Sequence, residues 1–169
     1  LGRHLRRRHR TRAGLALDTL AKRKRCTRTL DLGCGSGVLA MSAAKLWRHI
    51  VCASDIDPIA VRVARENAMR NGLGMLVRPV TATGFAHPVI AHGAPYNLVL
   101  ANILARPLMA LAAPMSRHLA PGGHVILSGL LQSQEAAVRS AYATRGLFLV
   151  RRFLLGEWST LLLRKPVLL

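Results

Sequence analysis

The chain has 169 residues, of which 51% are hydrophobic and 19% charged, with a formal net charge of +18. This composition argues against a disordered protein and is typical of one domain with a buried core, and no segment is long and apolar enough to predict a membrane span. The three cysteines are odd in number and lack metal-type spacing, which favours free thiols in a reducing compartment such as the cytoplasm.

The chain begins with a strongly basic segment. Eleven of its 25 lysines and arginines fall within the first 28 positions. Both a polyanion-binding arm and a solvated tail fit this pattern, and a transit peptide is a weaker alternative. No aromatic residue interleaves with these charges to stack on bases, which favours the tail. We divide the chain into a basic arm, residues 1–12, and one domain, residues 13–169, and predict for the arm at most weak, non-specific contact with RNA.

Short apolar runs then alternate with segments of helical periodicity. The predicted strands of this region are Thr29–Leu32, Ile50–Ser54, Met75–Val80, Asn97–Ala101 and His124–Ser128. The predicted helices between and after them are Val38–Trp47, Pro58–Asn71, Pro107–Leu119 and Gln132–Arg145. Regular alternation of strand and helix predicts a parallel sheet with helices on both faces.

Local signals predict where some of these elements begin and end. Asp57 followed by Pro58 predicts a helix start, with a capping carboxylate and proline in the first turn. Asn71 and Gly72 predict the end of that helix. A proline and two glycines at residues 121–123 predict a turn.

The alternation stops near the end of the chain. Phe148–Leu155 and Ser159–Arg164 are both strand-like, and the three residues between them leave no room for a crossover helix. We therefore predict an antiparallel hairpin, which brings the sheet to seven strands. The predicted fold is the Rossmann-like α/β fold of the class I methyltransferases, with a mostly parallel sheet; half of a dehydrogenase domain would lack this hairpin.

A glycine loop lies between the first predicted strand and the helix after it. Its sequence, D-L-G-C-G-S-G, starts at Asp31 and includes Gly33, Cys34, Gly35 and Gly37. Glycines let the backbone turn tightly and approach a ligand, and the amides at the following helix start favour an anionic group. The spacing is G-x-G-x-G and differs from the G-x-G-x-x-G of dinucleotide-binding proteins.

An acidic residue closes the next predicted strand. Asp55 follows the loop by about twenty residues, where a carboxylate can accept hydrogen bonds from both hydroxyls of a ribose. Of the seven acidic residues in the chain, Asp31, Asp55 and Asp57 all fall in this short region. We interpret Asp57 as a helix cap, and a hydrogen bond that braces the loop is the alternative role for Asp31. The pattern predicts a site for a nucleoside cofactor.

The chain contains five motifs in this order: DLGCGSG, SDIDP, NLVLANIL, LAPGGHVILSG and GEWSTLLL. With these motifs it resembles the PrmA family. Members of that family methylate ribosomal protein number eleven of the large subunit, on lysine side chains and on its N-terminal amine. The likeness covers roughly residues 13–165. The first two motifs are shared by most class I methyltransferases, whereas Asn102–Leu104 followed by Ala-Arg-Pro is more particular to this family.

The resemblance implies S-adenosylmethionine as the cofactor and a set of site residues. The implied cofactor-binding residues are Asp31, Gly33, Cys34, Gly35, Gly37, Asp55, Ile56 and Asn102. In this set the glycines cradle the methionine part and Asp55 holds the ribose. The implied catalytic residues are Asn102, which lines the transfer site, and Leu104, which forms part of its wall. Independently of the family, the amide oxygen of Asn102 can accept a hydrogen bond from a neutral amine, and a turn-forming role is the alternative.

The chain also departs from the family pattern. Members carry a separate N-terminal recognition domain and a glycine-rich loop ahead of the first helix, so we expect a chain truncated at its N-terminus. Asn97 and Thr83 stand where the family usually has aspartates. The leading prediction is a cytoplasmic protein-lysine methyltransferase, with a large-subunit ribosomal protein as its substrate. The alternatives are an RNA or DNA base methyltransferase, disfavoured because no aromatic residue follows Asn102, and a non-catalytic binding module.

Overall fold

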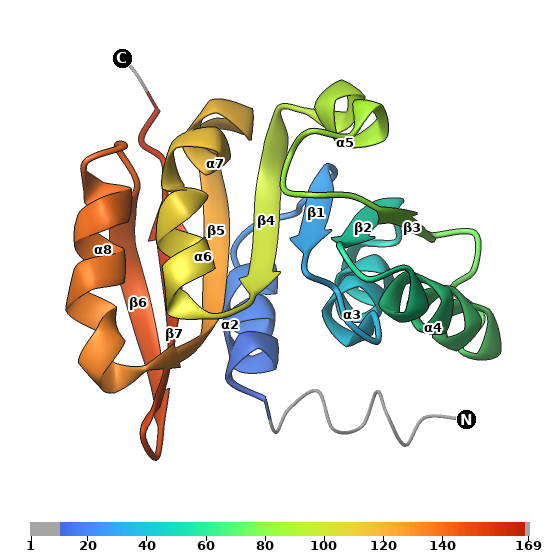
Figure 1. Cartoon of the computed structure of the whole chain (residues 1–169), viewed down its shortest axis with the longest axis horizontal. Coiled ribbons are helices and arrows are strands. Elements are labelled where there is room, and N and C mark those ends of the chain that lie inside the picture. Colours follow the sequence, from blue (N-terminus) through green and yellow to red (C-terminus); the bar gives the residue numbers. More distant parts are fainter. Residues whose placement is uncertain (1–10, 168–169) are drawn as a thin grey trace.

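The structure, a computed structural model, describes residues 11–167, so the first ten residues of the basic arm lie outside the described part. Its centre is a seven-stranded sheet in the order β3-β2-β1-β4-β5-β7-β6 (Figure 1). The strands are β1 (Thr29–Leu32), β2 (Val51–Asp55), β3 (Val77–Thr81), β4 (Tyr96–Asn102), β5 (Leu119–Leu131), β6 (Phe148–Leu155) and β7 (Trp158–Arg164). The first five are parallel and β7 runs antiparallel to both of its neighbours, which confirms the predicted sheet and hairpin.

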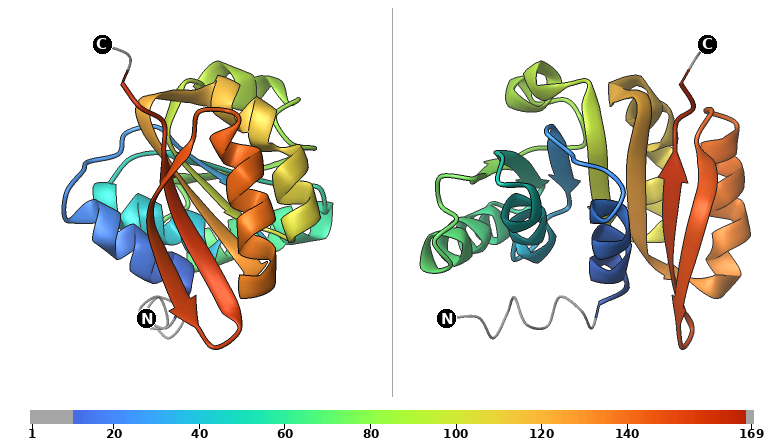
Figure 2. Two further views of the ribbon diagram at one scale, coloured as in Figure 1. Left: turned by 90° about the vertical axis from the view of Figure 1, so that its left-hand side faces the viewer. Right: turned by 180° about the vertical axis from the view of Figure 1, so that it is seen from behind.

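Helices cover both faces of the sheet (Figures 1 and 2). They are α2 (Arg12–Ala21), α3 (Val38–Trp47), α4 (Pro58–Arg70), α5 (Pro88–Gly93), α6 (Ala105–Ala110), α7 (Ala112–His118) and α8 (Glu135–Ala143), with a short 3-10 turn, η2 (Gln132–Gln134). One hydrophobic core lies under α2 to α4 and a second under α5 to α8. All four residues of β1 are buried, as expected for a parallel strand covered on both sides. Among residues 11–167, no helix is long and apolar enough to cross a membrane.

The predicted helix Pro107–Leu119 is wrong, because the structure divides this segment into α6 and α7. The break falls at Leu111, whose backbone N–H still bonds to Pro107 O at 3.1 Å. In one continuous helix, Pro114 would have no amide hydrogen to donate to the carbonyl of Ala110, and its ring would collide with that carbonyl. Two shorter helices place both prolines in a first turn, where no backbone donor is lost.

The predicted turn at residues 121–123 is also wrong, because these residues lie within β5. Gly122 takes a φ of 73°, which only glycine adopts readily. Its N–H bonds to Lys165 O at 2.9 Å, and Lys165 N–H bonds to Gly123 O at 2.9 Å. The glycines therefore absorb an irregularity in a strand that stays paired with the segment after β7.

Two helices were not predicted, and one changes the domain boundary. Thr11 accepts a hydrogen bond from Gly14 N at 3.1 Å and caps α2, and Leu17 of α2 is fully buried. The structure thus places Thr11 and Arg12, which we had assigned to the arm, within the domain. The other unpredicted helix is the six-residue α5.

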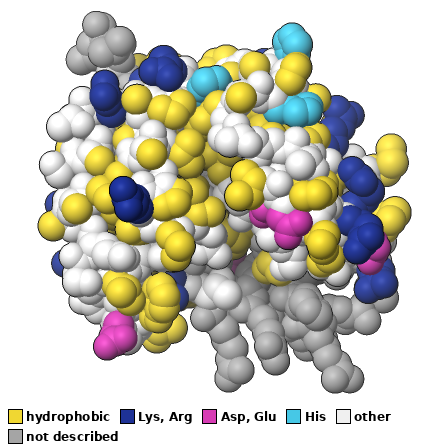
Figure 3. All heavy atoms as spheres, in the orientation of Figure 1, with side chains coloured by type: hydrophobic (Ala, Val, Ile, Leu, Met, Phe, Trp, Pro, Cys, Tyr) yellow, Lys and Arg dark blue, Asp and Glu magenta, His cyan; other side chains and the backbone are white. Residues whose placement is uncertain are grey.

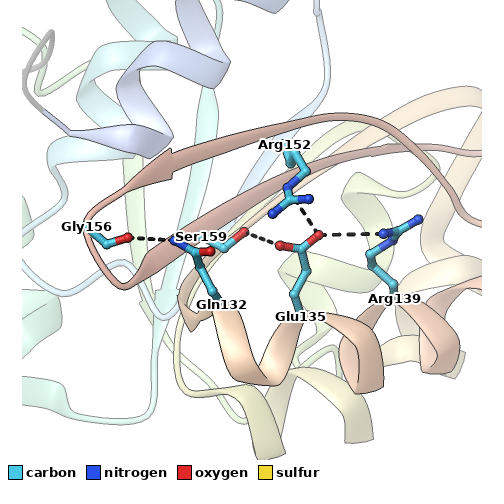
Figure 4. A network of polar contacts seen from close by, with 6 residues as sticks. All are labelled: Gln132, Glu135, Arg139, Arg152, Gly156 and Ser159. Carbon is cyan, nitrogen blue, oxygen red and sulfur yellow. Dashed lines mark hydrogen bonds and ion pairs between the residues drawn. The ribbon is translucent and has the colours of Figure 1, made fainter.

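The β6–β7 hairpin is tied to α8 by a polar network around Glu135 (Figure 4). The Glu135 side chain is buried and accepts a hydrogen bond from Ser159 Oγ at 3.0 Å. Arg139 and Arg152 lie 3.7 and 3.5 Å from its other oxygen. Gln132 Nε2 donates to Gly156 O at 2.6 Å. These contacts hold the turn of the hairpin, and with it Trp158, against the end of β5.

Candidate active site

The glycine loop follows β1, and its backbone has a conformation that residues with a side chain rarely adopt. Gly33, Gly35 and Gly37 have φ values of 67°, 51° and 80°, in the left-handed region that favours glycine. A Cβ on Gly33 would lie 2.4 Å from the Ile103 side chain, and one on Gly37 would lie 3.1 Å from the Cβ of Ala64. The glycines therefore serve close packing of the loop against its neighbours as well as its turn.

Asp31 braces the loop from behind. Its side chain is 1% exposed, and Oδ2 accepts a hydrogen bond from Ala40 N at 3.0 Å, while Oδ1 has no partner among the described residues. Burial raises the pKa of Asp31 from 3.8 to about 7, the Ala40 hydrogen bond lowers it, and the nearby charge of Asp55 raises it further. This arrangement matches the loop-bracing alternative, and Asp31 does not line the cleft described below.

We expect Asp31→Asn to alter how the free energy of unfolding depends on pH. Between the unfolded pKa of 3.8 and the folded pKa of about 7, only the unfolded chain has lost this proton. Each unit of rising pH then removes up to about 1.4 kcal/mol of stability through this group. The parent should therefore lose stability relative to the variant as pH rises from 4 to 7, because asparagine does not titrate.

Urea unfolding of both proteins at one-unit steps of pH measures this difference. Burial, with smaller contributions from Lys24 and Arg164, lowers the pKa of His124 to about 4, so that residue changes stability in the opposite direction. The contribution of His124 to stability is the same in both proteins, so it cancels when their free energies of unfolding are compared. A difference between the two proteins that stays constant with pH would contradict the prediction.

Asp55 connects the end of β2 to the glycine loop. Its Oδ2 accepts a hydrogen bond from Gly35 N at 2.9 Å, and its Oδ1 accepts one from Asp57 N at 3.0 Å. An ionised carboxylate has about four acceptor sites, so two remain for a ligand. Asp57 caps α4 by accepting a hydrogen bond from Ile59 N at 2.8 Å, as predicted from the sequence.

A cleft of about 600 Å³ opens beside Asp55 at the carboxyl ends of the strands. This is the edge at which open parallel sheets bind ligands, and the volume suits a small-molecule site. Of the predicted site residues, those that line it are Gly33, Asp55, Ile56, Asn102 and Leu104. Further lining residues that the sequence reasoning missed are Leu32, Ser54, Ala82, Thr83, Gly84, Ile103, Pro107, Ala110 and Leu111.

Four predicted residues do not line the cleft. Asp31 and Cys34 are buried, and Gly35 and Gly37 shape the loop behind its wall. Burial raises the pKa of the Cys34 thiol, and the charges of Asp31 and Asp55 raise it further, so this thiol is unreactive. Gly35 still contributes through its amide, which bonds to Asp55.

Asn102 lies at the end of β4, on the rim of the cleft. Ser128 Oγ, at the equivalent position of β5, donates a hydrogen bond to Asn102 Oδ1 at 2.7 Å. A Cβ on Gly129 would lie 2.7 Å from Ile103 O and 3.2 Å from Asn102 Oδ1. The sequence predicts an amine ligand as a hydrogen-bond partner of the Asn102 amide. The structure gives it an internal one, which orients the amide and leaves a lone pair of its oxygen available.

A second cleft, of about 390 Å³, adjoins the first at Asn102. It shares Asn102, Ile103 and Leu104 with the first cleft, and its other lining residues are Arg12, Gly129 and Trp158. Arg12 donates a hydrogen bond to Leu155 O at 3.1 Å, and its guanidinium lies 5.6 Å from the centre of the Trp158 ring. Ligands in the two clefts could thus meet at Asn102 and Leu104.

Only indirect signals for this second cleft are present in the sequence. Trp158 belongs to the quoted motif GEWSTLLL and Gly129 is the last residue of LAPGGHVILSG, yet the sequence analysis assigns neither a role. Arg12 was placed in the basic arm. The two departures from the family pattern also have places in the structure: Thr83 lines the first cleft, and Asn97 accepts hydrogen bonds from Thr27 N and Arg28 N. Within the part of the chain that the structure describes, no cluster of side chains could hold a metal ion.

Comparison with known proteins shows which protein family has this sequence pattern. The sequence profile of the ribosomal protein L11 methyltransferase (PrmA) family matches residues 8–166. Ribosomal protein L11 methyltransferase of Bradyrhizobium diazoefficiens is 56% identical over 89% of this chain and 51% of its own length. That of Rhodopseudomonas palustris is 54% identical over 92% of the chain and 53% of its own length. The chain therefore spans about half the length of these curated relatives.

A solved structure supports the same grouping. Ribosomal protein L11 methylase of Lactobacillus delbrueckii subsp. bulgaricus superposes with a TM-score of 0.83 at 30% identity. The match covers 92% of this chain and 77% of that one. The two proteins therefore share this fold over most of the chain.

Proposed function

Because the chain belongs to the ribosomal protein L11 methyltransferase (PrmA) family, we propose that it transfers methyl groups from S-adenosylmethionine to amino groups of a large-subunit ribosomal protein. The acceptors would be lysine side chains and the N-terminal amine. The observation that carries the proposal is the pair of clefts that meet at Asn102 and Leu104, one beside Asp55 and one beside Trp158. The reaction would take place in the cytoplasm, where the three free cysteines stay reduced.

The residues of the first cleft fit S-adenosylmethionine. Asp55 has acceptor sites left for two ribose hydroxyls, and the apolar side chains of Ile56 and Leu111 suit the faces of an adenine ring. The amides of the glycine loop and the start of α3 favour the carboxylate of the methionine part. When bound, S-adenosylmethionine would supply a sulfonium methyl group, to whose carbon the amine nitrogen would bond as the carbon–sulfur bond breaks and S-adenosylhomocysteine leaves.

The second cleft fits the acceptor amine. Trp158 and Leu104 offer apolar surface to the methylene chain of a lysine, and the Asn102 oxygen can accept a hydrogen bond from the amine and direct its lone pair. A free lysine has a pKa near 10.4 and is mostly protonated at neutral pH. The guanidinium of Arg12 beside this cleft opposes a second positive charge, so it favours the neutral, nucleophilic amine.

Trp158 also bears on the alternative of a base methyltransferase. It supplies an aromatic ring at the transfer site that the sequence reasoning did not foresee, and such a ring can stack on a flipped base. Arg12, however, lies over that ring and is anchored to Leu155 O. This cover favours a narrow aliphatic acceptor.

Two measurements on the purified chain test the proposal. Calorimetry should show binding of S-adenosylmethionine and none of NAD, because the loop lacks the dinucleotide spacing. Transfer of a labelled methyl group should reach a purified large-subunit ribosomal protein and not bare ribosomal RNA. Labelling of the RNA alone would favour the base methyltransferase. Cofactor binding without transfer to either acceptor would identify a binding module.

A further inference from the structure

The end of the sheet opposite the two clefts carries a group of cations, which we call the basic pole: Lys24, Arg25, Arg28, Arg48 and Arg164. Four of them come from the connection between α2 and β1 and from the end of α3, and the fifth ends β7. This connection reaches the amino end of β1 in the rear view of Figure 2. Four of the five side chains are exposed, and Lys24 is half-buried.

Contacts between the three segments bring these cations together. Lys24 Nζ donates a hydrogen bond to Gly122 O at 2.6 Å, and Lys24 O accepts one from Trp47 Nε1 at 3.1 Å. Arg48 directly follows Trp47. The guanidinium of Arg164 lies 4.0 Å from where a Cβ on Gly122 would stand. Lys24 therefore links the end of α3 to Gly122, beside which Arg164 lies.

The electrostatics of two histidines, the buried His124 and the half-buried His49, agree with this clustering. Burial lowers the pKa of His124, and the charges of Lys24 and Arg164 lower it further. His49 lies beside Arg48 in the chain, and burial and the charge of Arg25 lower its pKa. Cations from two separate segments, Lys24 and Arg164, thus act on His124, as expected where their fields overlap.

Most carboxylates of the chain lie outside the segments that carry this group. Asp55 and Asp57 follow β2 at the cleft end of the sheet, and Glu157 is in the hairpin turn there. Six of the seven carboxylates in the chain lie away from the pole in this way: Asp31, Asp55, Asp57, Glu66, Glu135 and Glu157. The seventh, Asp18, is on α2, before the connection begins. Glu66 and Glu135 form ion pairs with Arg70, Arg139 and Arg152, which lie outside the pole.

We propose that the basic pole binds the phosphate backbone of RNA. Arginine predominates in it, and the planar guanidinium matches phosphate oxygens with two parallel hydrogen bonds. Trp47 is buried, and the exposed Phe148 opposite Arg164 offers a single ring, so phosphate contacts dominate and we expect binding that depends little on sequence. The pole and the clefts lie at opposite ends of β4, about 20 Å apart at the usual rise per strand residue. A bound RNA therefore leaves both clefts open.

RNA fits this surface better than an anionic membrane does. Membrane-binding surfaces combine cations with large apolar side chains that insert between lipids. The exposed apolar residues next to pole cations in the chain or in the sheet are Ile50, Phe148 and Val167, and they lie on three separate segments. The proposal depends on charge and geometry at this end of the sheet and does not rest on the proposed methyl transfer.

Charge reversal in the full chain tests the proposal. The variant Arg25→Glu, Arg28→Glu and Arg48→Glu is compared with Arg62→Glu, Arg78→Glu and Arg151→Glu, three exposed arginines away from the pole. Both variants change the net charge equally and keep residues 1–10. Fluorescence anisotropy measures binding to a labelled single-stranded RNA of about 20 nucleotides, without cofactor, over a series of salt concentrations.

We expect the pole variant to lose RNA affinity by ten-fold or more. The slope of log affinity against log salt should become shallower by about 2, since each lost phosphate contact contributes about 0.7 for single strands. The control variant should change the slope by less than half as much. Equal losses in both variants would overturn the proposal by indicating an effect of net charge alone. Tighter binding of the parent to vesicles of anionic phospholipid than to RNA would also overturn the proposal. A triple glutamine variant at the pole, with circular dichroism of each protein, separates lost contacts from misfolding.

Discussion

Asp55→Ala is expected to weaken binding of S-adenosylmethionine by about 30-fold or more, which corresponds to about 2 kcal/mol. The carboxylate would lose its bonds to the ribose hydroxyls, and charge-assisted hydrogen bonds are the strong ones in such sites. The substitution also releases Gly35 N, which now bonds to Asp55 Oδ2 at 2.9 Å, so the glycine loop loses its link to the end of β2. Both effects lower the affinity for S-adenosylmethionine.

Calorimetry of Asp55→Ala beside Asp57→Ala separates ribose binding from general damage. Asp57 lies two residues further on and caps α4, so its removal should cost about 1 kcal/mol of stability and change cofactor affinity by no more than a few-fold. Asp55→Asn keeps one acceptor oxygen and should fall between the parent and the alanine variant. Unchanged affinity in Asp55→Ala would falsify the ribose assignment.

Asn102→Ala is expected to lower methyl transfer to a ribosomal-protein substrate by ten-fold or more while cofactor affinity stays within a few-fold of the parent. The reason is geometric: Asn102 Oδ1 is held by Ser128 Oγ at 2.7 Å between the two clefts, where it can align an amine. Loss of one aligned hydrogen bond in the transition state has about this effect on rate. Rates at saturating cofactor measure it.

Ser128→Ala is the matched variant for Asn102. It keeps the amide and removes the hydrogen bond that orients it, so the rate should fall by a smaller factor than in Asn102→Ala. A purely structural role for Asn102 would instead lower stability and cofactor affinity together with the rate. Equal rates for the parent and Asn102→Ala, with cofactor saturating, would rule out a role in aligning the acceptor.

Local sequence patterns were sufficient for the elements that surround the cofactor cleft. The strand Thr29–Leu32 and the helix Val38–Trp47 have their predicted bounds, because an apolar run, a glycine loop and an amphipathic segment follow one another there. The cap at Asp57 and the antiparallel hairpin after Phe148 also depend on neighbouring residues alone. In each case the interactions responsible span only a few residues, so their signal is complete in the sequence.

In two other segments, the structure differs from what the local sequence pattern predicts. The apolar periodicity of residues 107–119 indicated one helix, but Pro114 cannot donate a backbone hydrogen bond inside it and the segment breaks at Leu111. The glycines at 122 and 123 indicated a turn, but pairing with Lys165 keeps them in β5. A partner strand some forty residues away decided that outcome.

The candidate site divides in the same way. Gly33, Asp55 and Asn102 could be placed from sequence, because each follows a predicted parallel strand and such strands end at one edge of a sheet. The cleft formed by Arg12, Gly129 and Trp158 could not, since α2, β5 and β7 meet only in the folded chain. Burial likewise made Asp31 a brace for the loop, and the pairing of β4 with β5 gave Asn102 its partner Ser128. Contacts between residues far apart in sequence leave no periodic pattern, so only the tertiary structure determines them.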